Sequence, residues 1–202
     1  MIYITAICSD VLINYDSYEL FINDILNKIN KDDKIIIVTS SLKNHSSELL
    51  EQILKLNINT PDNLIDLLLS NIEIESTGFL GIILDKYKTN YDILTPYQIP
   101  ILVNNEEIEY VEINNILSVL SKKQILIIPG NIGISRTLKP QYYGSDGPEY
   151  LGFYLYKEFK KRRLKALCYI YKDNKENNDS MFSDKVECLI KSHNLSYTIK
   201  NL

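Results

Sequence analysis

The chain has 202 residues, 45% of them hydrophobic and 24% charged, which is typical of one globular domain with a substantial core. Its formal net charge of −4 gives no general attraction to nucleic acid or to an anionic membrane, so we expect neither as a partner, and any anion site must be local. The three cysteines lack metal-ligand spacing and the longest apolar runs are too short to span a bilayer, so we expect a cytoplasmic protein without a metal site.

The first forty residues predict a β-α-β unit. Residues 2–8 (IYITAIC) form an uninterrupted apolar run, which predicts a buried strand. Ser17 is expected to cap a helix, because the apolar residues between positions 18 and 29 recur at helical spacing. Residues 34–40 (KIIIVTS) then predict the next buried strand.

Helices and strands continue to alternate along the rest of the chain. Helices are predicted after Ser46, after the Thr60-Pro61 pair, again from about Thr77, and over 116–120, 148–163 and 186–193. Strands are predicted at 99–103, 110–113, 124–129, 165–171 and 196–199. This alternation predicts an α/β protein, a three-layer α/β/α sandwich with a mostly parallel central sheet.

Four of the seven glycines lie between Ile128 and Gly147 (IPGNIGISRTLKPQYYGSDG). A buried strand, a Pro-Gly turn, a loop with hydroxyl and basic residues and a Gly-Ser-Asp helix start together favour an anion cradle at a helix N-terminus. Arg136 and Lys139 lie within this segment and are either anion ligands or solvated loop charges. Asp146 is either a functional carboxylate or an ordinary helix cap.

The order of these parts resembles the amino-acid kinase family, and within it the aspartokinases. The segments that carry the resemblance are IYITAICSDV (2–11), ESTGFLGIILDKY (75–87), PGNIG (129–133), TL (137–138) and YYGSD (142–146). The resemblance spans nearly all of the chain. It implies a single amino-acid-kinase-like domain over residues 1–202, shortened at its C-terminus.

The resemblance also implies roles for individual residues. It places substrate contacts at Ser9, Thr77, Gly78 and Ser145, and nucleotide contacts at Gly130, Gly133, Lys172 and Asp173. It gives Asp146 a catalytic role, shared with Lys139 and Arg136 if the protein is active. An active enzyme of this kind would use ATP with magnesium, and family members commonly pair as homodimers.

Several positions depart from the family pattern. Thr5 stands where the family has a phosphoryl-stabilising lysine, and Ile7 and Cys8 stand where two glycines approach the phosphates. Phe79 replaces a substrate-binding glutamate, and Tyr142 replaces an arginine. Phosphoryl transfer depends mainly on placed positive charge, and losing one such group costs roughly 10²–10³ in rate.

These departures favour a pseudokinase: a non-catalytic, aspartokinase-like protein that binds a small anion or amino acid, or acts as a regulatory partner of an active homologue. One alternative is an active ATP-dependent amino-acid kinase that phosphorylates a carboxylate and uses Arg136 or Lys139 in place of the lysine. A second alternative is an assembly protein whose cleft is filled by Phe79, Tyr142 and Ile7.

Overall fold

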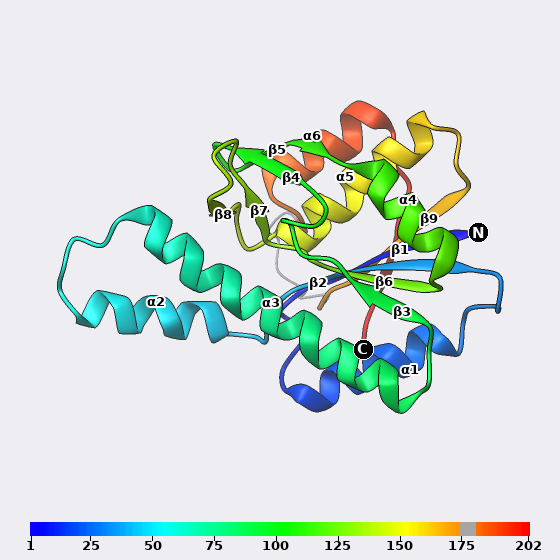
Figure 1. Cartoon of the computed structure of the whole chain (residues 1–202), viewed down its shortest axis with the longest axis horizontal. Coiled ribbons are helices and arrows are strands. Elements are labelled where there is room, and N and C mark those ends of the chain that lie inside the picture. The colour runs from blue at the N-terminus through cyan, green and yellow to red at the C-terminus, as the bar shows by residue number, and fades with distance from the viewer. Residues whose placement is uncertain (174–180) are drawn as a thin grey trace.

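The computed structural model describes residues 1–173 and 181–202, which form two sheets and six helices (Figure 1). The strands are β1 (Ile2–Ile7), β2 (Lys34–Thr39), β3 (Tyr91–Ile93), β4 (Ile101–Asn104), β5 (Glu107–Val111), β6 (Ile125–Pro129), β7 (Ile132–Ile134), β8 (Pro140–Tyr142), β9 (Ala166–Tyr171) and β10 (Thr198–Lys200). The helices are α1 (Tyr15–Leu26), α2 (His45–Lys55), α3 (Asp62–Lys86), α4 (Ile113–Lys122), α5 (Gly147–Lys161) and α6 (Asp184–His193).

The central sheet has six parallel strands in the order β10-β9-β1-β2-β6-β3. One face packs against α1 and α3, and the other packs against α4, α5 and α6, as Figure 1 shows. The side chains of β1 divide between the two faces: Ile4 and Ala6 join the core beneath α5, whereas Tyr3 and Ile7 join the core above α1. The predicted α/β/α sandwich with a mostly parallel sheet is confirmed.

A second, four-stranded sheet in the order β5-β4-β7-β8 lies beside the central one on the α5 side. The strands predicted at 99–103 and 110–113 belong to this sheet, as β4 and β5. The glycine-rich segment, expected to be a loop, contributes the antiparallel pair β7 and β8. Gly133 lies in β7, where a Cβ atom would collide with Val103 of β4, so this glycine permits close pairing of strands.

Two helix starts differ from the prediction. The cap of α1 is Asn14: its side chain accepts the Ser17 N–H at 3.1 Å, and the Ser17 hydroxyl accepts the Asn14 N–H in return. Helix α3 is continuous through Thr77 and Gly78, where a new helix was expected. A buried face along α3 stabilises this length and outweighs the helix cost of its two glycines, about 1 kcal/mol each.

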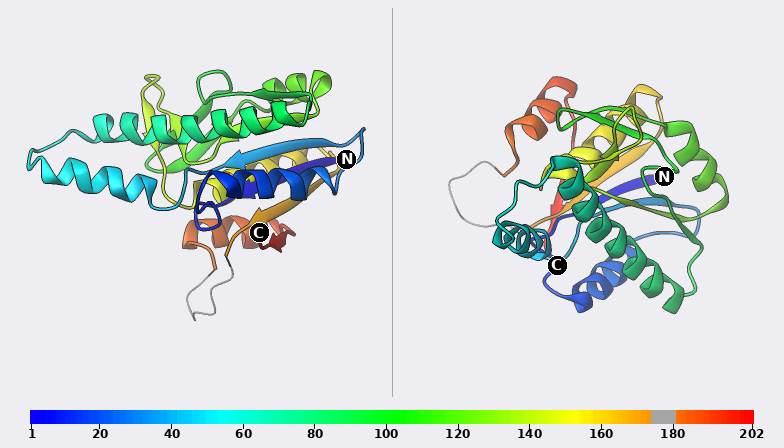
Figure 2. Two further views of the ribbon diagram at one scale, coloured as in Figure 1. Left: turned by 90° about the horizontal axis from the view of Figure 1, so that it is seen from below. Right: turned by 60° about the vertical axis from the view of Figure 1, so that its left-hand side comes forward.

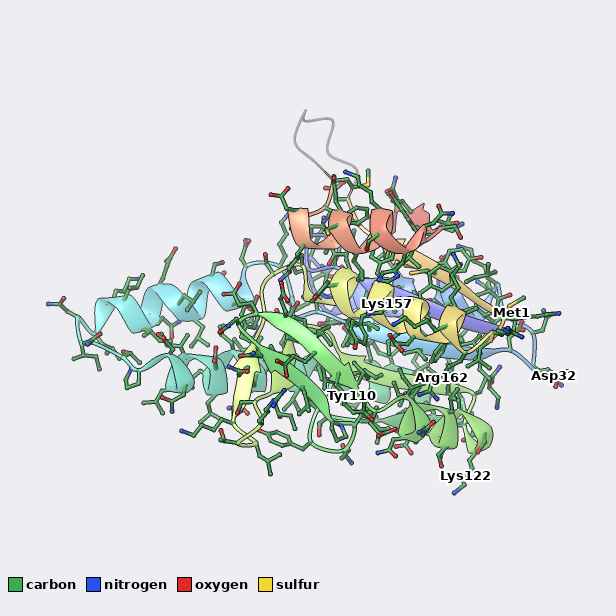
Figure 3. The ribbon with its side chains drawn as sticks, turned by 90° about the horizontal axis from the view of Figure 1, so that it is seen from above. Met1, Asp32, Tyr110, Lys122, Lys157 and Arg162 are labelled. Carbon is green, nitrogen blue, oxygen red and sulfur yellow. The ribbon has the colours of Figure 1, made fainter. Side chains whose placement is uncertain are left out.

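Several side chains of the basic run at the end of α5, residues 157–165, are held by local contacts. Lys157 and Lys161 both pair with Glu158, and Arg162 donates to the Asn114 side chain at 2.8 Å. Figure 3 shows Lys157 and Arg162 along α5, on the side of the molecule that α6 also occupies. Three of its basic side chains are thus bonded within the fold.

Helix α2 and the first turns of α3 project from the rest of the molecule as an arm, residues 45–70 (Figures 1 and 2). The arm carries exposed apolar side chains: Leu50, Leu54, Leu56, Ile58, Leu64, Leu67 and Leu68. Within the described residues, α3 alone is long and apolar enough to cross a membrane by length and composition, a stretch that the sequence analysis had not identified. Half of the apolar window in this helix is buried inside the protein.

Candidate functional site

A cleft of about 370 Å³ opens at the edge of the central sheet where the parallel strands end. In open α/β sheets, ligands bind outside these carboxyl ends. The turns after β1, β2 and β6 contribute to the cleft, together with the start of α2 and the segment before α5. Serine hydroxyls dominate the lining: Ser9, Ser40, Ser41, Ser46, Ser47 and Ser145.

A buried carboxyl supports the floor of the cleft. Glu73 of α3 is 0% exposed, and its Oε1 accepts the Asn131 amide at 2.9 Å and the Ser41 N–H at 3.4 Å. The same amide donates to Ser40 at 3.0 Å, so Asn131 ties α3 to the end of β2. Burial raises the pKa of Glu73 to about 7, although these hydrogen bonds oppose the rise.

Two lysines near the cleft are paired with carboxylates from the start of α5. Lys172, at the end of β9, lies 2.8 Å from buried Glu149. Lys185 of α6 lies 3.2 Å from Asp146 and also donates to the Tyr143 carbonyl at 2.6 Å. Both cations are therefore substantially neutralised within the fold.

At the cleft, one carboxylate is only partly hydrogen-bonded and one ammonium group is exposed. Asp10 lines the cleft, half-buried, and accepts the Asp173 N–H at 3.2 Å through Oδ2. Its Oδ1 has no hydrogen-bond partner in the described part of the chain, and burial raises the pKa of this carboxyl. Lys43 is exposed at the cleft, on the turn before α2.

The backbone at the ends of β1 and β6 is bonded to neighbouring strands. The Cys8 N–H donates to the Tyr171 carbonyl at 3.0 Å, and the Gly130 N–H donates to Thr39 at 2.7 Å. A Cβ at Gly130 would lie 2.8 Å from Pro148, so the start of α5 packs directly on this turn. The Cys8 thiol is buried, which raises its pKa, and nearby Glu149 adds to the rise.

Several residues proposed from the sequence gather at this edge. Ser9 and Ser145 line the cleft, and the Asp173 N–H contacts Asp10. Asp146 lies at the start of α5, where Ser183 also donates to it. Lys172 is nearby, in its pair with Glu149. Their roles toward a ligand stay predictions.

Other proposed residues lie elsewhere. Arg136, on the turn between β7 and β8, is 80% exposed and pairs with Glu109 at 3.1 Å; Lys139 is exposed on the same turn. Thr77 is buried and donates to the Ile74 carbonyl of its own helix at 2.6 Å. Gly78 is exposed beside it.

Thr5 also faces away from this edge. Its side chain lies in mid-strand and lines a different cavity, between the sheet and α1.

No protein-family model and no curated protein matches the chain. Solved structures do match its fold. An aspartate kinase from Synechocystis has a TM-score of 0.70 and 16% identity, over 86% of this chain and 28% of that one. Aspartokinase III of E. coli, in complex with lysine and aspartate, has a TM-score of 0.65 and 13% identity, over 86% and 49%. UMP kinase from Ureaplasma parvum has a TM-score of 0.59 and 15% identity, over 100% and 90%.

These neighbours confirm the expected fold: the chain folds as amino-acid kinases do. The identities are low, so the likeness concerns the fold alone. The chain spans less than half the length of both aspartokinases but nine-tenths of UMP kinase.

Proposed function

We propose that this chain binds a free amino acid in the cleft at the carboxyl edge of its sheet and does not phosphorylate it. The carrying observation is the composition of that cleft: many hydroxyls, one half-buried carboxylate at Asp10 and one exposed ammonium at Lys43. An amino acid carries both charges, so Asp10 would receive its ammonium and Lys43 its carboxylate, with the serines bonding the remaining polar atoms. Aspartokinase III of E. coli, which shares the fold, was solved with lysine and aspartate.

The residues at the cleft do not fit a nucleoside triphosphate with magnesium. A phosphate cradle needs free backbone N–H groups and unpaired cations. Here the N–H groups of Cys8 and Gly130 are bonded to neighbouring strands, and Lys172 and Lys185 are paired with carboxylates. These residues therefore do not support phosphoryl transfer. Binding without transfer favours a regulatory role, either alone or beside an active homologue.

The two alternatives are less well supported. A rearranged kinase would need Arg136 or Lys139 at the site, whereas Arg136 pairs with Glu109 on an outer turn. An assembly protein would have its cleft filled, whereas Phe79 packs on Tyr15 at a ring distance of 4.2 Å and Ile7 lies in the core above α1. Tyr142 does line the cleft but leaves it open.

The test is the thermal unfolding midpoint with L-aspartate, L-lysine, inorganic phosphate or Mg-ATP, since a ligand of the folded state raises the midpoint. We expect a rise with an amino acid and none with Mg-ATP. Lys43→Gln should abolish the rise, and Lys55→Gln, at the exposed far end of α2, should preserve it.

Two outcomes would contradict the proposal. A rise with Mg-ATP, together with ADP formation that disappears in Asp146→Asn, would favour the kinase. The absence of a rise with every compound would favour the assembly role.

A further inference from the structure

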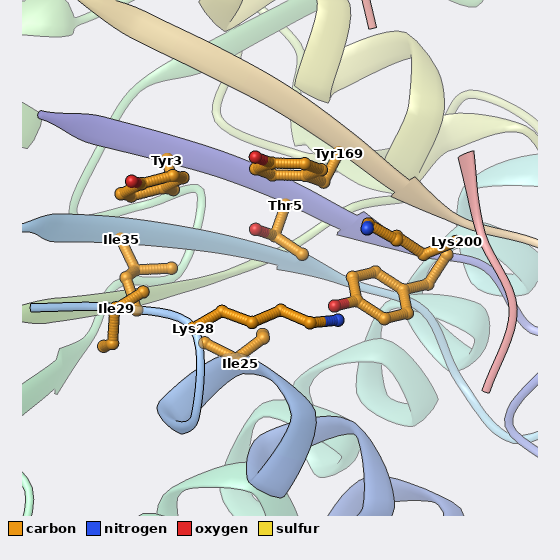
Figure 4. A pocket seen from close by; sticks show the side chains of 9 residues that line it. Tyr3, Thr5, Ile25, Lys28, Ile29, Ile35, Tyr169 and Lys200 are labelled. Carbon is orange, nitrogen blue, oxygen red and sulfur yellow. The ribbon is translucent and has the colours of Figure 1, made fainter. Parts of the chain in front are cut away.

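A second cavity, of about 150 Å³, lies between the central sheet and α1 (Figure 4). It shares no lining residue with the cleft at the carboxyl edge. Side chains on one face of β1, β2, β9 and β10 form one wall, and the C-terminal end of α1 with the residues after it forms the other. An apolar cavity of about this volume accommodates one benzene ring.

The walls of this cavity are suited to an aromatic ring. Tyr3 and Tyr169 stack side by side, with ring centroids 5.9 Å apart and planes 18° apart. Ile25 and Ile35 face the same space from α1 and β2. Aromatic side chains favour offset-stacked and edge-to-face contacts with further rings, so a planar ligand would gain more here than an aliphatic one.

One end of the cavity is cationic. Lys28 and Lys200 extend toward this end in Figure 4, and the positive charges of both ammonium groups lower the pKa of Asp24. Asp24 pairs with Lys28 and accepts the Tyr171 hydroxyl. Two ammonium groups and one carboxylate leave a net charge of +1, which favours an anionic ligand.

A buried polar group also faces the cavity. Thr5 is 3% exposed, in the middle of the central strand, and its hydroxyl has no hydrogen-bond partner among the described residues. Figure 4 shows Thr5 between the tyrosine rings and Lys28. Because Thr5 lines the cavity, its hydroxyl is available there as a hydrogen-bond donor and acceptor.

We propose that this cavity binds a small single-ring aromatic carboxylate. The ring lies between the tyrosines and the isoleucines, the carboxylate lies against Lys28 and Lys200, and Thr5 donates a hydrogen bond to it. The site is separate from the amino-acid cleft: it lies between the sheet and α1, whereas the cleft lies at the carboxyl edge of the sheet, and the two have no lining residue in common.

The test uses 4-fluorobenzoate, whose binding is followed by fluorine NMR and isothermal titration calorimetry. We expect saturable binding that weakens about tenfold in Lys200→Met and roughly fivefold in Thr5→Val, which keeps the shape and removes the hydroxyl. Lys191→Met is the control, because it also removes one ammonium group, from a 75% exposed lysine of α6 that does not line the cavity. That variant should bind normally.

Two further comparisons separate ring, charge and location. 4-Fluorobenzyl alcohol, with the same ring and no charge, should bind at least about tenfold more weakly. Lys43→Gln, which alters the amino-acid cleft, should leave 4-fluorobenzoate binding unchanged, so the two proposals fail separately. The absence of saturable binding would overturn the proposal. So would an affinity in both Thr5→Val and Lys200→Met equal to that of the wild-type protein, or an alcohol that binds as well as the acid.

Discussion

Glu73 makes the stability of the protein depend on pH. Its folded-state pKa of about 7 lies above the ordinary 4.5, so its favourable contribution is complete below pH 4.5 and is lost as the pH rises through 7. The loss is on the order of 3 kcal/mol. We expect Glu73→Gln to flatten the dependence of unfolding free energy on pH between 5 and 8, as measured by urea denaturation.

Glu75→Gln provides the control for this prediction, because Glu75 is exposed on the same helix. It should leave the pH dependence unchanged. Equal flattening in both variants would show that Glu73 is not the group responsible.

The buried pair of Lys172 and Glu149 gives a second prediction at this scale. Lys172→Met leaves the buried Glu149 carboxylate without its cation, which we expect to cost roughly 2–4 kcal/mol, because the lysine side chain is still 23% exposed. Adding Glu149→Gln should restore much of the loss. Lys86→Met breaks an exposed, solvent-screened pair with Glu19 and should cost much less; a loss as large as that of Lys172→Met would contradict this explanation.

The roles of Ser9, Ser145 and Asp146 toward a ligand stay predictions, although the structure brings the first two to the cleft and the third to the start of α5. Sequence reasoning placed these three residues together through the resemblance to the amino-acid kinase family. It missed Lys185, which reaches Asp146 from a helix nearly forty residues later, because periodicity carries no information on how distant elements pack. Glu73 did have a signal: a carboxylate seven residues before Leu80 falls on the buried stripe of α3.

Helix α3 contains two glycines in different surroundings. A Cβ at Gly78 would meet nothing within 4 Å, whereas one at Gly81 would lie 2.9 Å from Ile93. We expect Gly78→Ala to stabilise the protein by roughly 0.5–1 kcal/mol, since alanine is the better helix former. Gly81→Ala should gain less. Thermal and urea unfolding of the two variants measure the difference, and a loss of stability in Gly78→Ala would contradict the interpretation.

Among the elements, long periodic segments were predictable and short strands were not. Strands β1, β2, β6 and β9 of the central sheet were predicted because their apolar runs are five or six residues long. The three-residue strands β3, β7 and β8 were missed, whereas β10, of the same length, was predicted at 196–199. Such strands depend on the neighbours that they pair with rather than on a local pattern.

The arm, residues 45–70, bears on assembly of the whole molecule. Leu54 is 77% exposed, Leu56 64% and Ile58 66%, and clustered exposed apolar side chains are typical of protein interfaces. We expect a homodimer that buries this surface, detectable by sedimentation velocity. Leu54→Asp with Ile58→Asp should give a folded monomer, whereas Glu51→Lys on the same helix should not by itself change fold. A monomeric wild-type protein at micromolar concentration would contradict the expectation.

The position of β1 in the centre of the sheet has a consequence during synthesis on the ribosome. The strand leaves the exit tunnel before the rest of the sheet, but its neighbour β9 starts at residue 166, so one of its hydrogen-bonding edges stays open until the segment from residue 166 has been translated. An open apolar edge is a template for pairing with another nascent chain. Slow translation or chaperone depletion should therefore reduce the soluble yield of this protein more than that of a chain whose central strands are neighbours in sequence.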